Sequence, residues 1–175
     1  MSEFEFYSIA ASIVLALALS RLITGIPHVF SRSRFDPVHG LFFSIAFLSC
    51  LYQWAATWSL STHPAWSVTD FVLLMAPAIS LYLAIHVLMS DAPDKVQSWR
   101  EHFQVVSGWF FLAFAATWVF GRIRNYVFLD EQVVLFAYVY LASLLIGVVK
   151  PTRLVSAAVG IVLLLLTLLG YWGLM

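Results

Sequence analysis

Residues 6–29 read FYSIAASIVLALALSRLITGIPHV, an apolar run whose single Lys, Arg, Asp or Glu residue is Arg21. An α-helix crosses the roughly 30 Å hydrocarbon layer of a bilayer with about 20 mainly apolar residues. The run is therefore long enough to span a membrane. Further apolar stretches of comparable length follow, at residues 38–60, 69–89, 102–122, 131–149 and 152–173. We predict an all-α fold, a polytopic transmembrane helical bundle with six transmembrane helices, forming a single domain over residues 1–175.

The composition suits lipid better than water. Of the 175 residues, 62% are hydrophobic and 10% are charged, whereas about a quarter of an ordinary soluble domain is charged. Nine basic and nine acidic side chains are too few to cover a soluble surface. Because these charges cancel, we do not expect nucleic acid to be a partner. The apolar composition makes the lipid bilayer the expected partner. The single cysteine, Cys50, excludes a disulfide or a multi-thiolate metal site within one chain.

Several breaks between the stretches contain residues that start helices. Asp36-Pro37 places a capping side chain before a proline that suits the first helical position. Ser67–Asp70 has capping-box spacing, with Asp in place of the usual Glu or Gln. Asp130-Glu131 places negative charge where the fifth helix should begin. Asp94 is expected to start the fourth helix early, ahead of the stretch 102–122, so that its first turns lie along the membrane interface.

The basic residues predict the orientation, because Lys and Arg in short loops are retained on the cytoplasmic side of a membrane. The breaks after the first, third and fifth stretches contain Arg32, Arg34, Lys95, Arg100, Lys150 and Arg153. The opposite side is mostly acidic, with Arg122 and Arg124 as exceptions. Both termini are therefore expected outside. The acidic start Met1–Phe6 lacks the basic region of a signal peptide, so residues 6–29 are expected to be retained.

Small side chains recur along the first predicted helix. Ser8, Ser12, Ala16, Ser20 and Thr24 follow one another every four residues, and Ala11, Ala18 and Gly25 every seven. Such a flank allows another backbone to approach closely. We interpret it first as a packing surface, within the bundle or between protomers. The alternative is a pore lined by hydroxyl groups.

Arg21 lies roughly 22 Å along this helix from Phe6, at 1.5 Å per residue. In the predicted orientation it falls in the cytoplasmic third of the hydrocarbon layer. It can extend to the headgroups or pair with another group inside the protein. Alternatively, it marks the path of an ion or substrate, because charge within a membrane is costly. Thr24 and His28 share its helical face, and the three side chains could together hold an anion.

Four histidines fall at the predicted cytoplasmic ends of the first four helices, whereas His63 falls on the other side. The four are His28, His39, His86 and His102. Imidazoles in one layer can bind a metal, ligate a haem or titrate near neutral pH. The alternative is that each is an ordinary interfacial residue, since no helix contains two of them at ligand spacing.

Three further polar or irregular positions lie within the predicted spans. Pro77 is near the middle of the third stretch, where it removes a backbone hydrogen bond and is expected to kink the helix. Ser80 is placed to satisfy the freed backbone. Gln53 lies deep in the second stretch. We interpret it mainly as the donor or acceptor of an interhelical hydrogen bond, and the alternative is that it lines a pathway.

Short sequence patterns resemble a group of small multi-pass bacterial inner-membrane proteins of uncharacterised activity. The patterns are Ser20–Gly25, Gln53-Trp54 with Trp58, and Trp99–Phe103 leading into Trp109–Phe111. The resemblance covers most of the chain, and it implies a bacterial inner membrane and no particular activity.

The sequence contains no phosphate-binding glycine loop, HExxH motif or GxSxG motif, so an enzyme is the less favoured class. We favour a homo-oligomeric channel or transporter-like protein that moves a small ion or solute and needs no cofactor. Its candidate pathway residues are Arg21, Thr24, His28, Gln53, Pro77 and Ser80. One alternative is a haem-binding membrane redox protein, with ligands among His28, His39, His86 and His102. Another is a structural or sensory subunit that requires a second membrane protein.

Overall fold

The computed structural model describes residues 3–61, 66–129, 135–150 and 152–173, in which every regular element is helical. The elements are α1 (Glu3–Val29), α2 (Pro37–Trp58), α3 (Val68–Leu88), the 3-10 turn η1 (Pro93–Lys95), α4 (Trp99–Leu129), α5 (Leu135–Val149) and α6 (Arg153–Gly173). The predicted all-α fold is thus confirmed for this part of the chain. Each of the six apolar stretches overlaps one α-helix.

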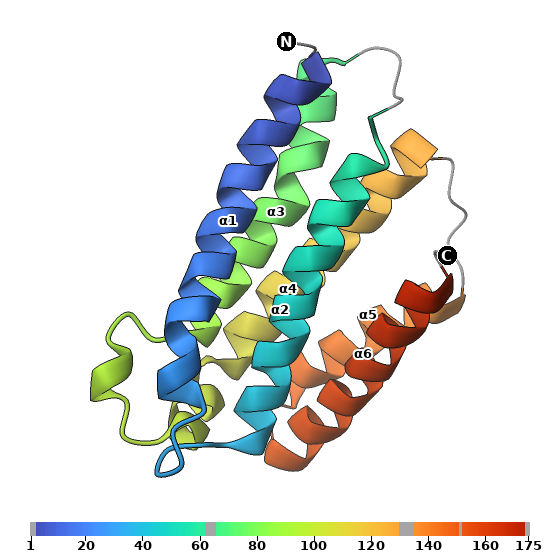
Figure 1. Ribbon diagram of the computed structural model, residues 1–175. Coiled ribbons are helices and arrows are strands. Elements are labelled where there is room, and N and C mark those ends of the chain that lie inside the picture. Colours follow the sequence, from blue (N-terminus) through green and yellow to red (C-terminus); the bar gives the residue numbers. More distant parts are fainter. Residues whose placement is uncertain (1–2, 62–65, 130–134, 151, 174–175) are drawn as a thin grey trace.

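The helices form an antiparallel bundle in which neighbours along the chain run in opposite directions (Figure 1). α1 packs beside α3, α3 packs most extensively on α4, and α2 contacts α1, α3 and α6. α5 and α6 form a tilted pair, drawn orange and red, that packs on α4 and α2. Consequently α2, α4 and α6 all begin near the same end of the bundle, which we call the basic end because Arg34, Arg100 and Arg153 lie there.

Four of the described helices, α1, α2, α3 and α4, are long and apolar enough to cross a membrane. α5 is apolar but has 15 residues, which at 1.5 Å per residue gives about 22 Å. That length falls short of the roughly 30 Å hydrocarbon layer. The structure therefore supports four candidate spans, and a bundle with six spans stays a prediction.

The buried face of α1 is a single stripe made of Ala11, Leu15, Ala18, Leu22, Gly25 and Val29. These positions alternate in steps of four and three residues, which keeps them on one side of a helix. At Gly25 a Cβ atom would overlap the methyl group of Met89 and would approach the ring of Phe43 to 3.7 Å. The small residues spaced by seven are therefore a packing surface within the chain. Ser20 and Thr24, from the series spaced by four, lie on the exposed flank.

Aromatic rings fill the space between α2 and α4. Phe42 of α2 stacks on Phe103 and meets Phe111 edge to face, each with 5.1 Å between ring centroids. Phe110 and Phe114 continue the cluster along α4. All five rings are buried. The centre of the described bundle is thus a packed hydrophobic core.

The helix starts follow the predicted caps where the structure describes them. Asp36 accepts a hydrogen bond from the backbone N–H of His39 at 3.0 Å. Ser67 and Asp70 form a capping box. The Ser67 hydroxyl accepts a hydrogen bond from the Asp70 N–H at 3.2 Å, and the Asp70 carboxylate accepts one from the Ser67 N–H at 2.8 Å. Asp130-Glu131 and His63 lie outside the described residues.

The expected start of α4 at Asp94 is wrong. Residues 93–95 form only a 3-10 turn, and Val96 is extended, with ψ of 113°. The helix begins at Trp99, where the Ser98 hydroxyl accepts from the N–H of Glu101 at 3.4 Å. Trp99 is fully buried, so this first turn packs into the protein instead of lying along an interface.

The expected end of the same helix at residue 122 is also wrong, because α4 continues to Leu129. The segment Arg122–Asn125 looks like a loop because three of its four residues are polar. In the structure, Arg124 and Asn125 are buried on the side of α4 that faces Gln53 of α2. Polar side chains that pair with another helix do not need to interrupt their own helix.

Gly147→Ala is expected to lower the free energy of unfolding by about 1–3 kcal/mol. A Cβ atom at Gly147 of α5 would lie 2.9 Å from three ring carbons of Phe111, which is fully buried in α4 and cannot easily move. Gly108→Ala in α4 is the control, since a Cβ there meets nothing within 4 Å. Thermal unfolding in detergent measures both variants. Equal melting temperatures would show that the α4–α5 contact is not tightly packed.

Candidate functional site

Arg21 is paired with groups of its own chain at the basic end. Its Nη2 donates to the carbonyl oxygen of Met89 at 3.1 Å and to the carboxylate of Asp91. Both partners belong to the α3–α4 loop, residues 89–98. One quarter of the Arg21 side chain is exposed, against three quarters of the Asp91 side chain. The hydrogen bond and charge of Arg21 lower the pKa of Asp91 below its usual 3.8.

Two histidines also face this loop. His28 Nδ1 lies 3.3 Å from the carboxylate of Asp94, and His86 Nε2 lies 3.8 Å from that of Asp91. Arg34 donates to the Asp94 carbonyl oxygen at 3.0 Å. Cationic or titratable side chains from α1, α3 and the α1–α2 connection therefore hold the α3–α4 loop by its acidic residues.

The predicted group of Arg21, Thr24 and His28 is only partly brought together. Arg21 and His28 contact different carboxylates of the same loop. The Thr24 hydroxyl donates to the Ser20 carbonyl oxygen of its own helix at 3.0 Å and is exposed. An anion at this face would have to replace Asp91 or Asp94.

The other two histidines surround Trp99. His39 is fully buried and stacks on the indole at 4.6 Å between centroids, and the His102 ring lies 6.2 Å from the His39 ring. His102 Nε2 bonds the Leu88 carbonyl oxygen at 3.1 Å. Both ring nitrogens of His39 are buried without a hydrogen-bond partner among the described residues. Of the four histidines, His39 and His102 contact each other, whereas His28 and His86 lie near different carboxylates. No group of three metal-ligating side chains occurs in the described part of the chain.

Trp99 itself connects the helices at the basic end, because its indole Nε1 donates to the carbonyl oxygen of His28 at 2.9 Å. The bond joins the last turn of α1 to the first turn of α4. No sequence pattern indicates this bond, since any interfacial tryptophan looks the same in an apolar sequence.

A buried polar cluster occupies the opposite part of the bundle. Arg124 of α4 is 1% exposed and donates from Nη1 to the side-chain oxygen of Gln53 in α2 at 3.0 Å. Its Nε and Nη2 donate to the side-chain oxygen of Asn125 at 3.1 and 2.9 Å. The interhelical hydrogen bond expected of Gln53 is present. Sequence reasoning misses Arg124 as a site residue because its polar neighbours suggest a loop, although a deep glutamine signals the need for a polar partner.

The two predicted positions in α3 lie in the packed part of the bundle. α3 continues through Pro77 from Val68 to Leu88, and both Pro77 and Ser80 are buried. The Ser80 hydroxyl makes no hydrogen bond with the residues that the structure describes. Neither side chain joins Arg21 or the Arg124 cluster.

These contacts define the candidate site as the Arg21 pair and the α3–α4 loop that covers it, with the Arg124 cluster as a separate buried charge. No protein-family model, curated protein or solved structure matches the chain.

Proposed function

We propose that the chain is a multi-pass membrane protein of the bacterial inner membrane, with six spans, the basic end in the cytoplasm and both termini outside. Four apolar helices of sufficient length support the membrane location. Arg34, Arg100 and Arg153 lie near one end of the bundle, and retention of basic loops in the cytoplasm gives the orientation. The acidic side chains Glu3, Glu5 and Asp70 belong to the opposite end.

Within that membrane, the protein is proposed to act as a homo-oligomer that moves a small anion, with Arg21 as the binding cation. The single observation that carries this proposal is the Arg21–Asp91 pair. Arg21 lies within an apolar helix, where charge is costly unless it has a function or a partner. Its partner is an exposed loop carboxylate, and ion pairs exposed to water are weak enough for a soluble anion to compete.

The pathway is proposed to run between protomers. Aromatic rings fill the space between α2 and α4, so the exposed flank of α1 is the favoured surface. That flank contains Ala16, Ser20 and Thr24 beside Arg21. Small side chains allow a second helix to approach closely, and the hydroxyl groups supply polar contacts.

Anion flux into liposomes tests this function. Liposomes with the wild-type protein are expected to take up a small anion such as nitrate faster than empty liposomes, and Arg21→Ala is expected to abolish the difference. Arg32→Ala is the matched control, because Arg32 is an exposed loop arginine of the same end. Equal uptake with and without protein would reject transport of the tested anion.

A haem-binding redox protein is the second candidate, and the contact between His39 and His102 favours it. The unpartnered nitrogens of His39 are free to ligate iron. Against it, the Trp99 indole covers one face of the His39 ring and the Leu88 carbonyl occupies His102 Nε2. A Soret band in the absorbance spectrum of the purified protein would favour this candidate over transport.

A further inference from the structure

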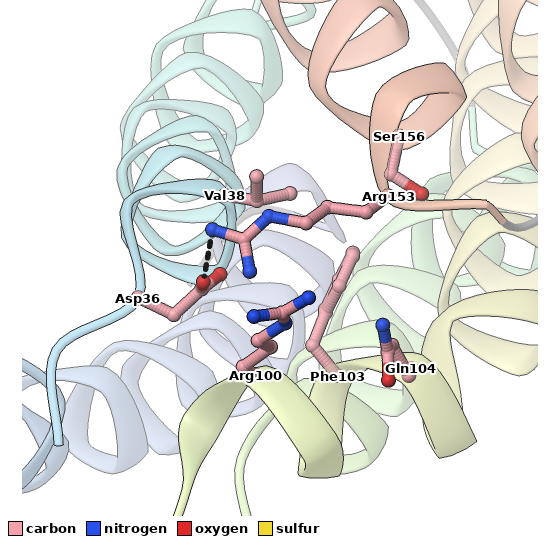
Figure 2. Close-up of a pocket in the computed structure, with 7 residues that line it drawn as sticks. All are labelled: Asp36, Val38, Arg100, Phe103, Gln104, Arg153 and Ser156. Carbon is pink, nitrogen blue, oxygen red and sulfur yellow. Dashed lines mark ion pairs between the residues drawn. The ribbon is translucent and has the colours of Figure 1, made fainter.

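A pocket opens at the basic end where the first turns of α2, α4 and α6 meet (Figure 2). Its polar lining consists of Asp36, Arg100, Gln104, Arg153 and Ser156, and Val38 and Phe103 complete the wall. Figure 2 shows Arg153 reaching from α6 across the pocket to Asp36, while the guanidinium of Arg100 rises from α4 below it. Two guanidinium groups therefore enter the same small space from different helices.

The pocket has an excess of positive charge. Arg153 Nη2 lies 2.9 Å from Asp36 Oδ1, and Asp36 Oδ2 accepts from the backbone N–H of His39. Both oxygens of the single carboxylate are thus in use. Arg100 has no ion pair with any residue of the described ranges, so its charge is not balanced there. The amino ends of three helices add further partial positive charge, which favours an anion.

Ser156 supplies a separate indication of a ligand. The residue is 1% exposed and lines the pocket one turn into α6. Its backbone N–H donates to the Thr152 carbonyl oxygen at 2.8 Å, but its hydroxyl makes no hydrogen bond to any described residue. A buried hydroxyl costs free energy unless it finds a partner. The enclosed space is about 10 Å³, room for about one water-sized group, so a single ligand oxygen there would satisfy the hydroxyl.

We propose that the mouth of this pocket binds a phosphate group, held by the solvent-exposed side chains of Arg100 and Arg153, with one phosphate oxygen directed inward toward Ser156. Guanidinium groups match phosphate oxygens in geometry as well as in charge. The phosphate can belong to the headgroup of an anionic lipid of the inner leaflet, which would lie at the depth of these first turns, or it can be free in solution. The site is separate from the Arg21 pair and does not depend on transport.

Lipid binding to the purified protein in neutral detergent tests the proposal. Native mass spectrometry is used to titrate the delipidated protein with phosphatidylglycerol and with phosphatidylcholine, whose headgroup has no net charge. Wild type is expected to prefer phosphatidylglycerol. Arg100→Gln is expected to weaken that binding about tenfold, the loss of one charge-assisted hydrogen bond. Lys150→Gln, which removes an exposed basic residue of the same end outside the pocket, is expected to leave it unchanged.

The two sources of phosphate give different results. Phosphatidylglycerol binding that depends on Arg100 and resists millimolar inorganic phosphate identifies the lipid headgroup. Inorganic phosphate that stabilises wild type against heat, but not Arg100→Gln, identifies free phosphate. Ser156→Ala is tested in the same two assays and leaves the charge of the pocket unchanged. It replaces Arg100→Gln if size-exclusion chromatography shows that Arg100→Gln does not fold. The proposal is overturned if neither probe distinguishes the pocket variants from wild type, or if Lys150→Gln loses as much binding as Arg100→Gln.

Discussion

Arg124→Ala is expected to lower the free energy of unfolding by about 3 kcal/mol or more, the largest effect on stability that we predict. Arg124 is almost fully buried and donates to the side chains of Gln53 and Asn125. Its removal takes a charged donor away from the side-chain oxygens of Gln53 and Asn125, and a buried polar group that loses a hydrogen bond costs about 1–3 kcal/mol. For a chain of this length, the melting temperature in detergent should fall by about 6–12 °C.

Two comparisons show whether the lost hydrogen bonds cause this fall. Arg124→Met keeps most of the side-chain volume and should still destabilise, whereas Gln53→Met in the same chain should recover part of the loss, because replacing both partners by apolar groups leaves fewer unsatisfied atoms. Arg32→Ala, at an exposed arginine, should leave the melting temperature unchanged. A melting temperature of Arg124→Ala equal to that of wild type would contradict the buried cluster.

Arg21→Asp is expected to reduce anion uptake by about tenfold or more, because a charge-assisted hydrogen bond to the anion is lost and a carboxylate takes its place. The substitution also places a second carboxylate opposite that of Asp91. The double variant Arg21→Asp with Asp91→Arg restores an ion pair but moves the cation from α1 to the α3–α4 loop. We expect the double variant to have a melting temperature near that of wild type, while its anion uptake stays as low as that of Arg21→Asp.

The double variant separates a structural role of the pair from anion binding. Recovery of uptake would show that pairing, and not the guanidinium on α1, is what matters, and it would contradict the proposed function. The assay belongs near neutral pH. Arg21 lowers the pKa of Asp91 below 3.8, so the ion pair stabilises the folded state above that pH and is lost only as the pH falls through the lowered pKa.

The helices could be predicted because the length and apolar character of a segment depend on its own residues. The cap at Asp36 and the box formed by Ser67 and Asp70 are equally local, and both are present. The limits of α4 could not be predicted in this way. Its start depends on how Trp99 packs, and its end depends on the partner that Arg124 finds in another helix.

The candidate site is predictable only in part, for the same reason. A charged residue within an apolar run is visible in the sequence, and so Arg21 can be identified. Its counter-ion lies 70 positions later in the chain, and nothing in the local pattern near Asp91 indicates that contact. The pocket of Arg100 and Arg153 joins helices that are also distant in sequence. The sequence alone uses these two residues to predict the orientation, and it does not indicate that they line one pocket.

Cysteine labelling tests most directly that the bundle crosses a membrane with its basic end inside. The chain has one cysteine, Cys50, which is buried, so a Cys50→Ala background has no other thiol. Ser33→Cys and Ser61→Cys then place one exposed thiol after α1 and one after α2. In intact spheroplasts, a membrane-impermeant maleimide is expected to label Ser61→Cys at once and Ser33→Cys only after permeabilisation. Labelling of both in intact spheroplasts, or of Ser33→Cys alone, would contradict the account.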